Sequence, residues 1–270
     1  MHESLTPSLL LDIGRVRANA ERMSQMARRN GVRLRPHIKT HKNVEIARIQ
    51  TEGFDGAITV STLAEARAFA KCGFTDITYA VPIEIGKFAA AVDILRGGVD
   101  LNLLTDDADT GRQLDLAAGD AGVKFDVFVK IDCGTHRVGV EPQTSEALAI
   151  PRLILDSQNL NFAGILTHAG HSYNVGTKDE ILEVARHERD SMVELAERLR
   201  VGGIPVPTVS VGSTPTMNLI DHLDGIDEIR PGNYIFFDNF QATLGSCSFD
   251  DTALTVLTAV IHKDNSRRRL

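Results

Sequence analysis

Hydrophobic residues along this chain fall into short runs that alternate with longer stretches of helical spacing. The short runs occupy residues 8–11, 34–38, 57–60, 77–81, 99–103, 125–131, 162–167, 208–211 and 227–230. Helical patterns fall between them, at residues 12–30, 44–50, 63–71, 86–95, 107–116, 145–156 and 178–200. Strands that alternate with helices predict an α/β fold with a parallel sheet.

The number of strands indicates how that sheet is arranged. Eight strands, from 34–38 to 227–230, are separated by helices, which is the number of a (β/α)8 barrel. We expect this barrel over residues 1–235. A doubly wound open sheet is the alternative, because the sequence does not show whether the sheet closes.

The pattern changes after Pro231 and Gly232. Residues 254–261 alternate loosely, as in an antiparallel strand, residues 263–266 predict a turn, and residues 267–270 predict the start of a returning strand. We therefore expect residues 236–270 to be the start of a carboxy-terminal β-domain that is truncated.

Composition and charge narrow the class of protein. The chain has 270 residues, and its formal net charge of −7 argues against binding to nucleic acid. The sequence has no secretory signal and no apolar stretch of membrane-spanning length, so we expect no membrane partner. Cys72, Cys133 and Cys247 are widely spaced, without a CxxC pair, which favours a reducing cytoplasm.

The strand predicted at 34–38 is unusual because it carries polar residues. Arg35, His37 and Lys39 alternate with apolar residues, so an extended backbone directs all three to one face. Parallel strands in α/β proteins are normally apolar on both faces. An interior lysine at the end of such a strand favours a chemical role, and burial lowers the pKa of its amine toward the neutral form.

Polar segments that contain glycine follow four other strands. They lie at residues 130–139, 167–173, 210–216 and 228–234, where the loops of a barrel carry its chemistry. In one of them, Gly212, Ser213 and Thr214 offer backbone N–H groups and hydroxyls to an anion such as phosphate; we call these residues the 212–214 turn. A phosphate site together with an interior lysine points to pyridoxal 5′-phosphate.

Five segments in order, at residues 35–42, 132–139, 170–173, 211–216 and 230–234, resemble those of the fold-type III pyridoxal-phosphate enzymes, the alanine racemase-like barrels. Within that superfamily the chain is most similar to the D-threonine aldolase and D-serine dehydratase family. The resemblance implies that Lys39 forms the Schiff base and that His168 and Tyr173 are also catalytic. It further implies that the cofactor is held by Lys39, Arg137, His168, Gly212, Ser213, Thr214 and Tyr234.

The resemblance also implies the reaction and the partners. We expect a lyase that acts on a small-molecule substrate, a D-3-hydroxy amino acid, by D-threonine aldol cleavage or D-serine dehydration. We also expect a homodimer. The family carries a His-x-Cys pair that binds a divalent metal, but no His-x-Cys occurs in this sequence, so we assign no metal ligand.

Several alternatives stay open. A non-catalytic carrier of the cofactor and an amino-acid racemase are alternative functions. A racemase needs a second proton-transfer group at Cα, which the sequence does not identify. Either His168 or His171 contacts the cofactor or substrate, and Arg137 has an ion pair with Asp132 as its alternative. The stripe Ile181, Ala185, Met192, Leu195 and Leu199 indicates core packing.

Overall fold

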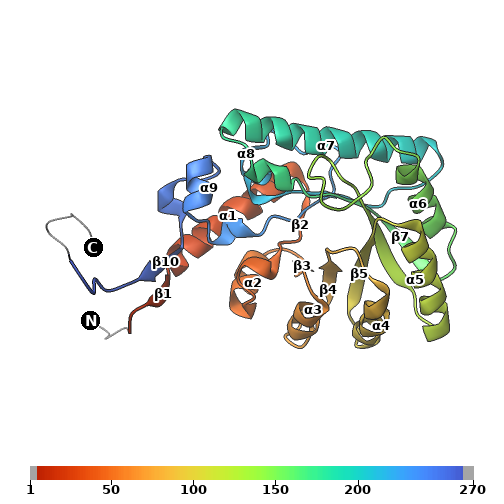
Figure 1. Cartoon of the computed structure of the whole chain (residues 1–270), viewed down its shortest axis with the longest axis horizontal. Helices are drawn as coiled ribbons and strands as arrows, with labels where there is room; N and C mark the ends of the chain where they lie inside the picture. Colours follow the sequence, from red (N-terminus) through yellow and green to blue (C-terminus); the bar gives the residue numbers. More distant parts are fainter. Residues whose placement is uncertain (1–4, 264–270) are drawn as a thin grey trace.

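The computed structural model describes residues 5–263. Its main feature is one sheet of eight parallel strands in the order β2-β9-β8-β7-β6-β5-β4-β3, with helices around it (Figure 1). This is the barrel architecture that the strand count predicts. The strands are β2 (Arg33–Leu34), β3 (Ile58–Val60), β4 (Asp76–Tyr79), β5 (Asp100–Thr105), β6 (Phe125–Lys130), β7 (Leu160–Leu166), β8 (Val209–Val211) and β9 (Glu228–Ile229).

The two edge strands, β2 and β3, meet at a seam that closes the barrel. A parallel bridge joins His37, just after β2, to Thr59 of β3. The Thr59 N–H donates to the Pro36 carbonyl at 2.9 Å, and the Thr59 hydroxyl donates to the Arg35 carbonyl at 2.9 Å. The closed barrel is therefore confirmed over the open sheet. The strand predicted at 34–38 is shorter than expected, because Pro36 has no N–H for the ladder and the chain then turns into the 3₁₀-helix η1 (Ile38–Thr40).

Helices follow most strands, close to the predicted positions. The Asp12 carboxylate accepts the Arg15 N–H at 3.0 Å and begins α1, and Gly31, at φ +66°, ends it. The α-helices are α1 (Ile13–Asn30), α2 (Val44–Gln50), α3 (Leu63–Ala70), α4 (Phe88–Arg96), α5 (Ala108–Ala121), α6 (Glu146–Leu155), α7 (Lys178–Val201), α8 (Thr214–Leu219) and α9 (Asn239–Leu244). Short 3₁₀-helices are η2 (Ile85–Lys87), η3 (Gly170–Tyr173), η4 (Asn233–Ile235) and η5 (Phe249–Asp251).

The first and last strands of the described chain form a separate ribbon. β1 (Ser8–Leu11) pairs antiparallel with β10 (Leu254–Leu257), and the ribbon stands off from the barrel in Figure 1. β1 lies at the short apolar run 8–11 and β10 lies within the alternating residues 254–261, although it is shorter than that range. The strand expected at 267–270 lies outside the described residues.

Apolar side chains form two clusters on opposite faces of the sheet. The large cluster packs between the strands and the helices. The small cluster consists of Leu104, Phe128 and Leu166, which lie on β5, β6 and β7 and alternate with residues of the large cluster, so they point into the barrel. The rest of the interior is polar, as described below.

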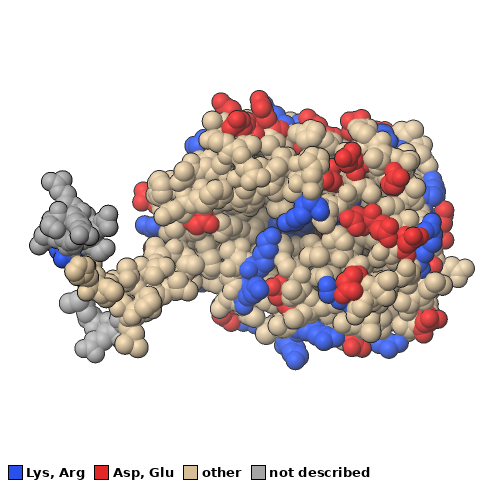
Figure 2. Space-filling model, viewed as in Figure 1, with Lys and Arg blue, Asp and Glu red and all other residues tan. Residues whose placement is uncertain are grey.

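The surface carries both signs of charge. Figure 2 shows Lys and Arg side chains across the middle of one face, with Asp and Glu over its upper and right-hand parts. Within residues 5–263, no helix is long and apolar enough to cross a membrane.

Candidate active site

A cavity of about 260 Å³ opens at the carboxyl ends of the strands, slightly below the ~300–1,000 Å³ of ordinary small-molecule pockets. The loops after β2, β3, β4, β6, β7, β8 and β9 all contribute to its wall. The structure brings together seven of the eight site residues that the sequence predicts. They are Lys39, Arg137, His168, Tyr173, Gly212, Ser213 and Thr214.

Lys39 lies in η1 and is open to the cavity. Its backbone N–H donates to Nδ1 of His37 at 3.3 Å, which fixes the start of the turn. Burial by the surrounding protein, then the charges of Arg137 and Arg230, lower the pKa of the Lys39 amine. The side chain is thus open to the cavity, and its lowered pKa increases the fraction of neutral amine.

Gly232 fixes the position of this segment. A Cβ on Gly232 would lie 2.8 Å from the His37 carbonyl oxygen, so only glycine lets the loop after β9 pack so closely. The lysine segment is therefore held between β9 on one side and β3 on the other.

The 212–214 turn is preformed. Gly212 has φ +112°, and a Cβ there would lie 3.0 Å from Cγ of Met217. The Ser213 hydroxyl accepts the Thr216 N–H at 3.3 Å and begins α8, and the Thr214 hydroxyl accepts the Tyr234 N–H at 3.2 Å. These bonds orient the turn toward the cavity that Lys39 also lines.

His168 is the histidine of its loop that faces the cavity. Its Nδ1 lies 3.3 Å from the Gly212 carbonyl oxygen, an acceptor only, so Nδ1 carries the proton and Nε2 is left as an acceptor. Burial, together with the charges of Lys39 and Lys130, lowers the pKa of His168 to about 3. The ring is therefore neutral at ordinary pH.

Neither His171, the alternative to His168, nor Asp132, the alternative partner of Arg137, lines the cavity. Nδ1 of His171 lies 3.3 Å from the Thr135 hydroxyl. Asp132 accepts backbone N–H groups of its own loop, and its Oδ2 lies 3.4 Å from Nδ1 of His136. Within residues 5–263, Arg137 has no ion-pair partner and lies exposed beside the cavity.

The two predicted tyrosines differ. Tyr173 lines the cavity and stacks on Phe240, with ring centroids 6.3 Å apart and an interplanar angle of 13°. Burial raises the pKa of Tyr173. The Tyr234 side chain is fully buried away from the cavity, and its hydroxyl has no hydrogen-bond partner among residues 5–263. What Tyr234 contributes to the site is its backbone N–H, which holds Thr214.

Sequence reasoning did not single out two buried cations of the cavity wall. Lys130 is 5% exposed, its Nζ donates to the Ile131 carbonyl at 2.8 Å, and burial lowers its pKa to about 8. Arg230 is also 5% exposed, and burial lowers its pKa to about 10. The alternation of side chains along β6 could have identified Lys130, because Lys130 and Phe128 are two residues apart and so lie on the same, inward face of the strand.

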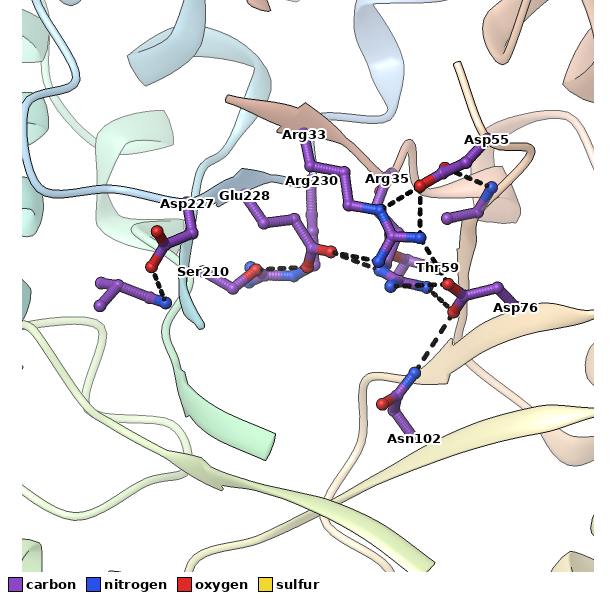
Figure 3. Close-up of polar contacts among 12 residues, drawn as sticks. Arg33, Arg35, Asp55, Thr59, Asp76, Asn102, Ser210, Asp227, Glu228 and Arg230 are labelled. Atoms are coloured by element: carbon purple, nitrogen blue, oxygen red, sulfur yellow. Dashed lines mark hydrogen bonds and ion pairs between the residues drawn. The ribbon is translucent and has the colours of Figure 1, made fainter. Parts of the chain in front are cut away.

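Arg230 is the inner end of a chain of alternating charges, which we call the charge ladder (Figure 3). The Arg230 guanidinium donates to the Ser210 hydroxyl, which donates to Glu228 at 2.7 Å. Nε of Arg35 donates to Glu228 at 2.6 Å. The ladder then continues toward the outside of the barrel through Asp76, Arg33 and Asp55.

The residues of the cavity fit pyridoxal phosphate. The 212–214 turn has a left-handed glycine and two hydroxyls beside the cavity, and Lys39 supplies an amine with a lowered pKa in the same cavity. The expectation that the turn offers its backbone N–H groups is corrected for two of the three residues, because the Gly212 N–H donates to Glu188 and the Ser213 N–H donates to Thr216. Two buried cations, Lys130 and Arg230, add positive charge to the cavity wall, which favours an anionic ligand. For a metal there is no such fit in the described residues, which contain no cluster of three or more His, Cys, Asp or Glu that could hold one.

Comparisons with known proteins agree with this geometry. The sequence model of the family described as alanine racemase, N-terminal domain, matches residues 11–240. D-threo-3-hydroxyaspartate dehydratase of Delftia sp. (strain HT23) is 41% identical over 257 residues, which are 95% of this chain and 67% of that protein. D-serine dehydratase of Dictyostelium discoideum is 36% identical over 272 residues, which cover 95% of this chain and 69% of that protein.

Solved structures give the same result. The Delftia dehydratase superposes with a TM-score of 0.93 at 40% identity, covering 98% of this chain and 70% of that chain. D-threonine aldolase from Filomicrobium marinum gives a TM-score of 0.85 at 27% identity, covering 93% of this chain and 69% of that chain. The chain spans about two thirds of the length of these relatives, and it belongs to the alanine racemase N-terminal domain family.

Proposed function

We propose that this protein is a pyridoxal-phosphate-dependent lyase of D-3-hydroxy amino acids, with Lys39 as the residue that attaches the cofactor. The observation that carries the proposal is that Lys39 and the 212–214 turn line one cavity. Pyridoxal phosphate needs both, because its aldehyde condenses with a lysine amine and its phosphate needs an anion site. The relatives named as dehydratases and aldolases of D-3-hydroxy amino acids support the substrate class.

When bound, the cofactor supplies an electron sink for the negative charge that develops at the substrate Cα. The chain supplies the rest. The lowered pKa of Lys39 keeps a larger fraction of its amine neutral, and only the neutral amine attacks an aldehyde. The free Nε2 of His168 can accept a hydrogen bond from the substrate, and Tyr173 offers a hydroxyl to the same space. Arg137 is an exposed cation that can bind the substrate carboxylate.

The attachment residue is tested by reduction with borohydride. We expect the full chain, incubated with pyridoxal phosphate, to develop a visible absorbance band, and reduction to fix the label on the peptide that contains Lys39. Lys39→Ala should lose both the band and the label. Lys42→Ala is the matched control, because Lys42 is exposed and pairs with Glu65 at 3.1 Å, so it should keep both. A label on Lys130 in the wild-type protein would contradict the assignment.

The reaction is tested with a panel of substrates and an added divalent metal, since a related structure is described as a metal-free form. Pyruvate and ammonia from D-serine, or oxaloacetate and ammonia from D-threo-3-hydroxyaspartate, identify a dehydratase. Glycine and acetaldehyde from D-threonine identify an aldolase. L-Alanine from D-alanine would identify a racemase instead, and a labelled protein that turns over none of these substrates would identify a carrier.

A further inference from the structure

A single carboxylate is buried in a helix face that is otherwise apolar. Glu188 of α7 is 0% exposed and lies in the same stripe as Ala185, Met192 and Leu195. A buried carboxylate costs free energy unless it accepts hydrogen bonds from several partners. The partners of Glu188 therefore indicate what it does.

Those partners belong to two different loops of the active site. Oε1 of Glu188 accepts the Ala169 N–H at 2.9 Å and the Gly212 N–H at 3.1 Å, and Oε2 lies 3.3 Å from the donor hydroxyl of Thr216. Ala169 follows His168 after β7, and Gly212 opens the 212–214 turn after β8. One side chain on an outer helix thus ties together both loops.

The same carboxylate closes a ring of buried hydrogen bonds. The Thr216 hydroxyl accepts the Ser213 N–H at 3.0 Å, the hydroxyls of Ser213 and Ser172 lie 2.9 Å apart, and the Ser172 hydroxyl donates to the Ala169 carbonyl at 2.7 Å. Every residue of this ring is at most 1% exposed. A fully satisfied polar network of this kind rigidifies what it connects.

We propose that Glu188 is a positioning residue that holds the 212–214 turn in the conformation that binds the phosphate of pyridoxal phosphate. This inference rests on the proposed function. Glu188 does not line the cavity, so it acts through the backbone of Gly212 and Ala169 and not by contact with a ligand. For this positioning role the length of the Glu188 side chain is more important than its charge, because a negative charge behind an anion site does not favour phosphate binding. Burial also raises the pKa of Glu188 and so favours its neutral form.

The test separates reach from charge with two variants of the full chain. Glu188→Gln keeps the reach and an acceptor oxygen but removes the charge, whereas Glu188→Asp keeps the charge but is one methylene shorter. Dissociation constants for pyridoxal phosphate and for pyridoxal, which lacks the phosphate, are measured by absorbance titration. We expect Glu188→Asp to weaken binding of pyridoxal phosphate by about tenfold, because buried N–H groups lose their acceptor, and to leave binding of pyridoxal within about threefold of wild type.

We expect Glu188→Gln to bind both ligands like the wild-type protein. Leu195→Ala is the control for instability alone, because Leu195 is 1% exposed in the same stripe and contacts neither loop through a hydrogen bond. It should lower stability yet keep the wild-type preference for pyridoxal phosphate over pyridoxal. The inference is overturned if Glu188→Asp also keeps that preference, or if Glu188→Gln loses it to the same extent. A wild-type protein without the preference and without a label on Lys39 would overturn the proposed function itself.

Discussion

The two halves of the barrel interior are filled by side chains of opposite character, apolar in one half and charged in the other. On the side of β5, β6 and β7, the apolar side chains of Leu104, Phe128 and Leu166 fill the interior, and Lys130 lies at its cavity end. On the side of β2, β8 and β9, it holds the charge ladder, in which Arg35 and Glu228 are 2% and 1% exposed. An apolar half needs only the right volume, whereas a charged half needs every partner in place.

The charged half is possible because cations and carboxylates follow one another in the charge ladder. Glu228 accepts from Arg35 and from Ser210, and Asp76 pairs with both Arg33 and Arg35, so each carboxylate lies among donors. Removing one partner leaves a charge uncompensated in a buried place. The ladder also ends at Arg230 in the cavity wall, so its order is tied to the site.

The largest expected effect comes from breaking the ladder at its most buried carboxylate. We expect Glu228→Leu to lower the free energy of unfolding by about 3–5 kcal/mol, because Arg35 then lacks its buried partner. Urea denaturation followed by circular dichroism measures the loss. Glu228→Gln keeps an acceptor and should lose less. Leu104→Met is the control in the apolar half and should cost less than about 1.5 kcal/mol. Equal losses for Glu228→Leu and Leu104→Met would remove the distinction between the halves.

A smaller effect is expected from titrating the outer part of the ladder. Burial alone would raise the pKa of Asp76, but the hydrogen bonds and charges of Arg35 and Arg33 outweigh it and hold that pKa below 3.8. Such a carboxylate stabilises the fold above its ordinary pKa, and this contribution is lost as pH falls through the folded-state value. We therefore expect the free energy of unfolding to fall more steeply with decreasing pH below about pH 4 in the wild-type protein than in Asp76→Asn. Identical slopes in a series of urea denaturations would show that Asp76 does not contribute.

The smallest effect is expected at the exposed mouth of the cavity. Burial lowers the pKa of Lys39 first and the charge of Arg137 lowers it further, so Arg137→Leu should raise that pKa toward the ordinary 10.5. The midpoint of the pH profile for borohydride-trapped cofactor should then move to higher pH. Arg186→Leu, which removes an exposed arginine paired with Asp221, should leave the midpoint unchanged. A midpoint that Arg137→Leu does not move would leave burial and the charge of Arg230 as the causes of the lowered pKa.

Local signals in the sequence predicted the fold well. Helix α1 (Ile13–Asn30) falls within the predicted range 12–30, and α2 has the predicted bounds 44–50. What the sequence could not give was long-range pairing. Nothing in residues 8–11 shows that β1 pairs with β10, because the period of a strand carries no information about its partner.

The candidate site was predictable where a residue lies in the segment that follows a strand, as Lys39 and His168 do, because the fold brings those segments together. Tyr234 misled because its motif position is close to the site while its side chain is fully buried and does not line the cavity. Glu188 was hidden inside a helical stripe that otherwise indicates core packing. Its function depends on amides of two distant loops, which no local pattern reveals.

The segment that bears Lys39 also completes the closed sheet of the barrel. It is joined to β3 through the bridge between His37 and Thr59, and it is pressed against the loop of Gly232. A ligand bound to the Lys39 amine is therefore attached to the segment through which the barrel closes. Ligand binding in the cavity and folding are therefore linked equilibria. The protein with ligand bound should unfold at a higher temperature than the protein without it.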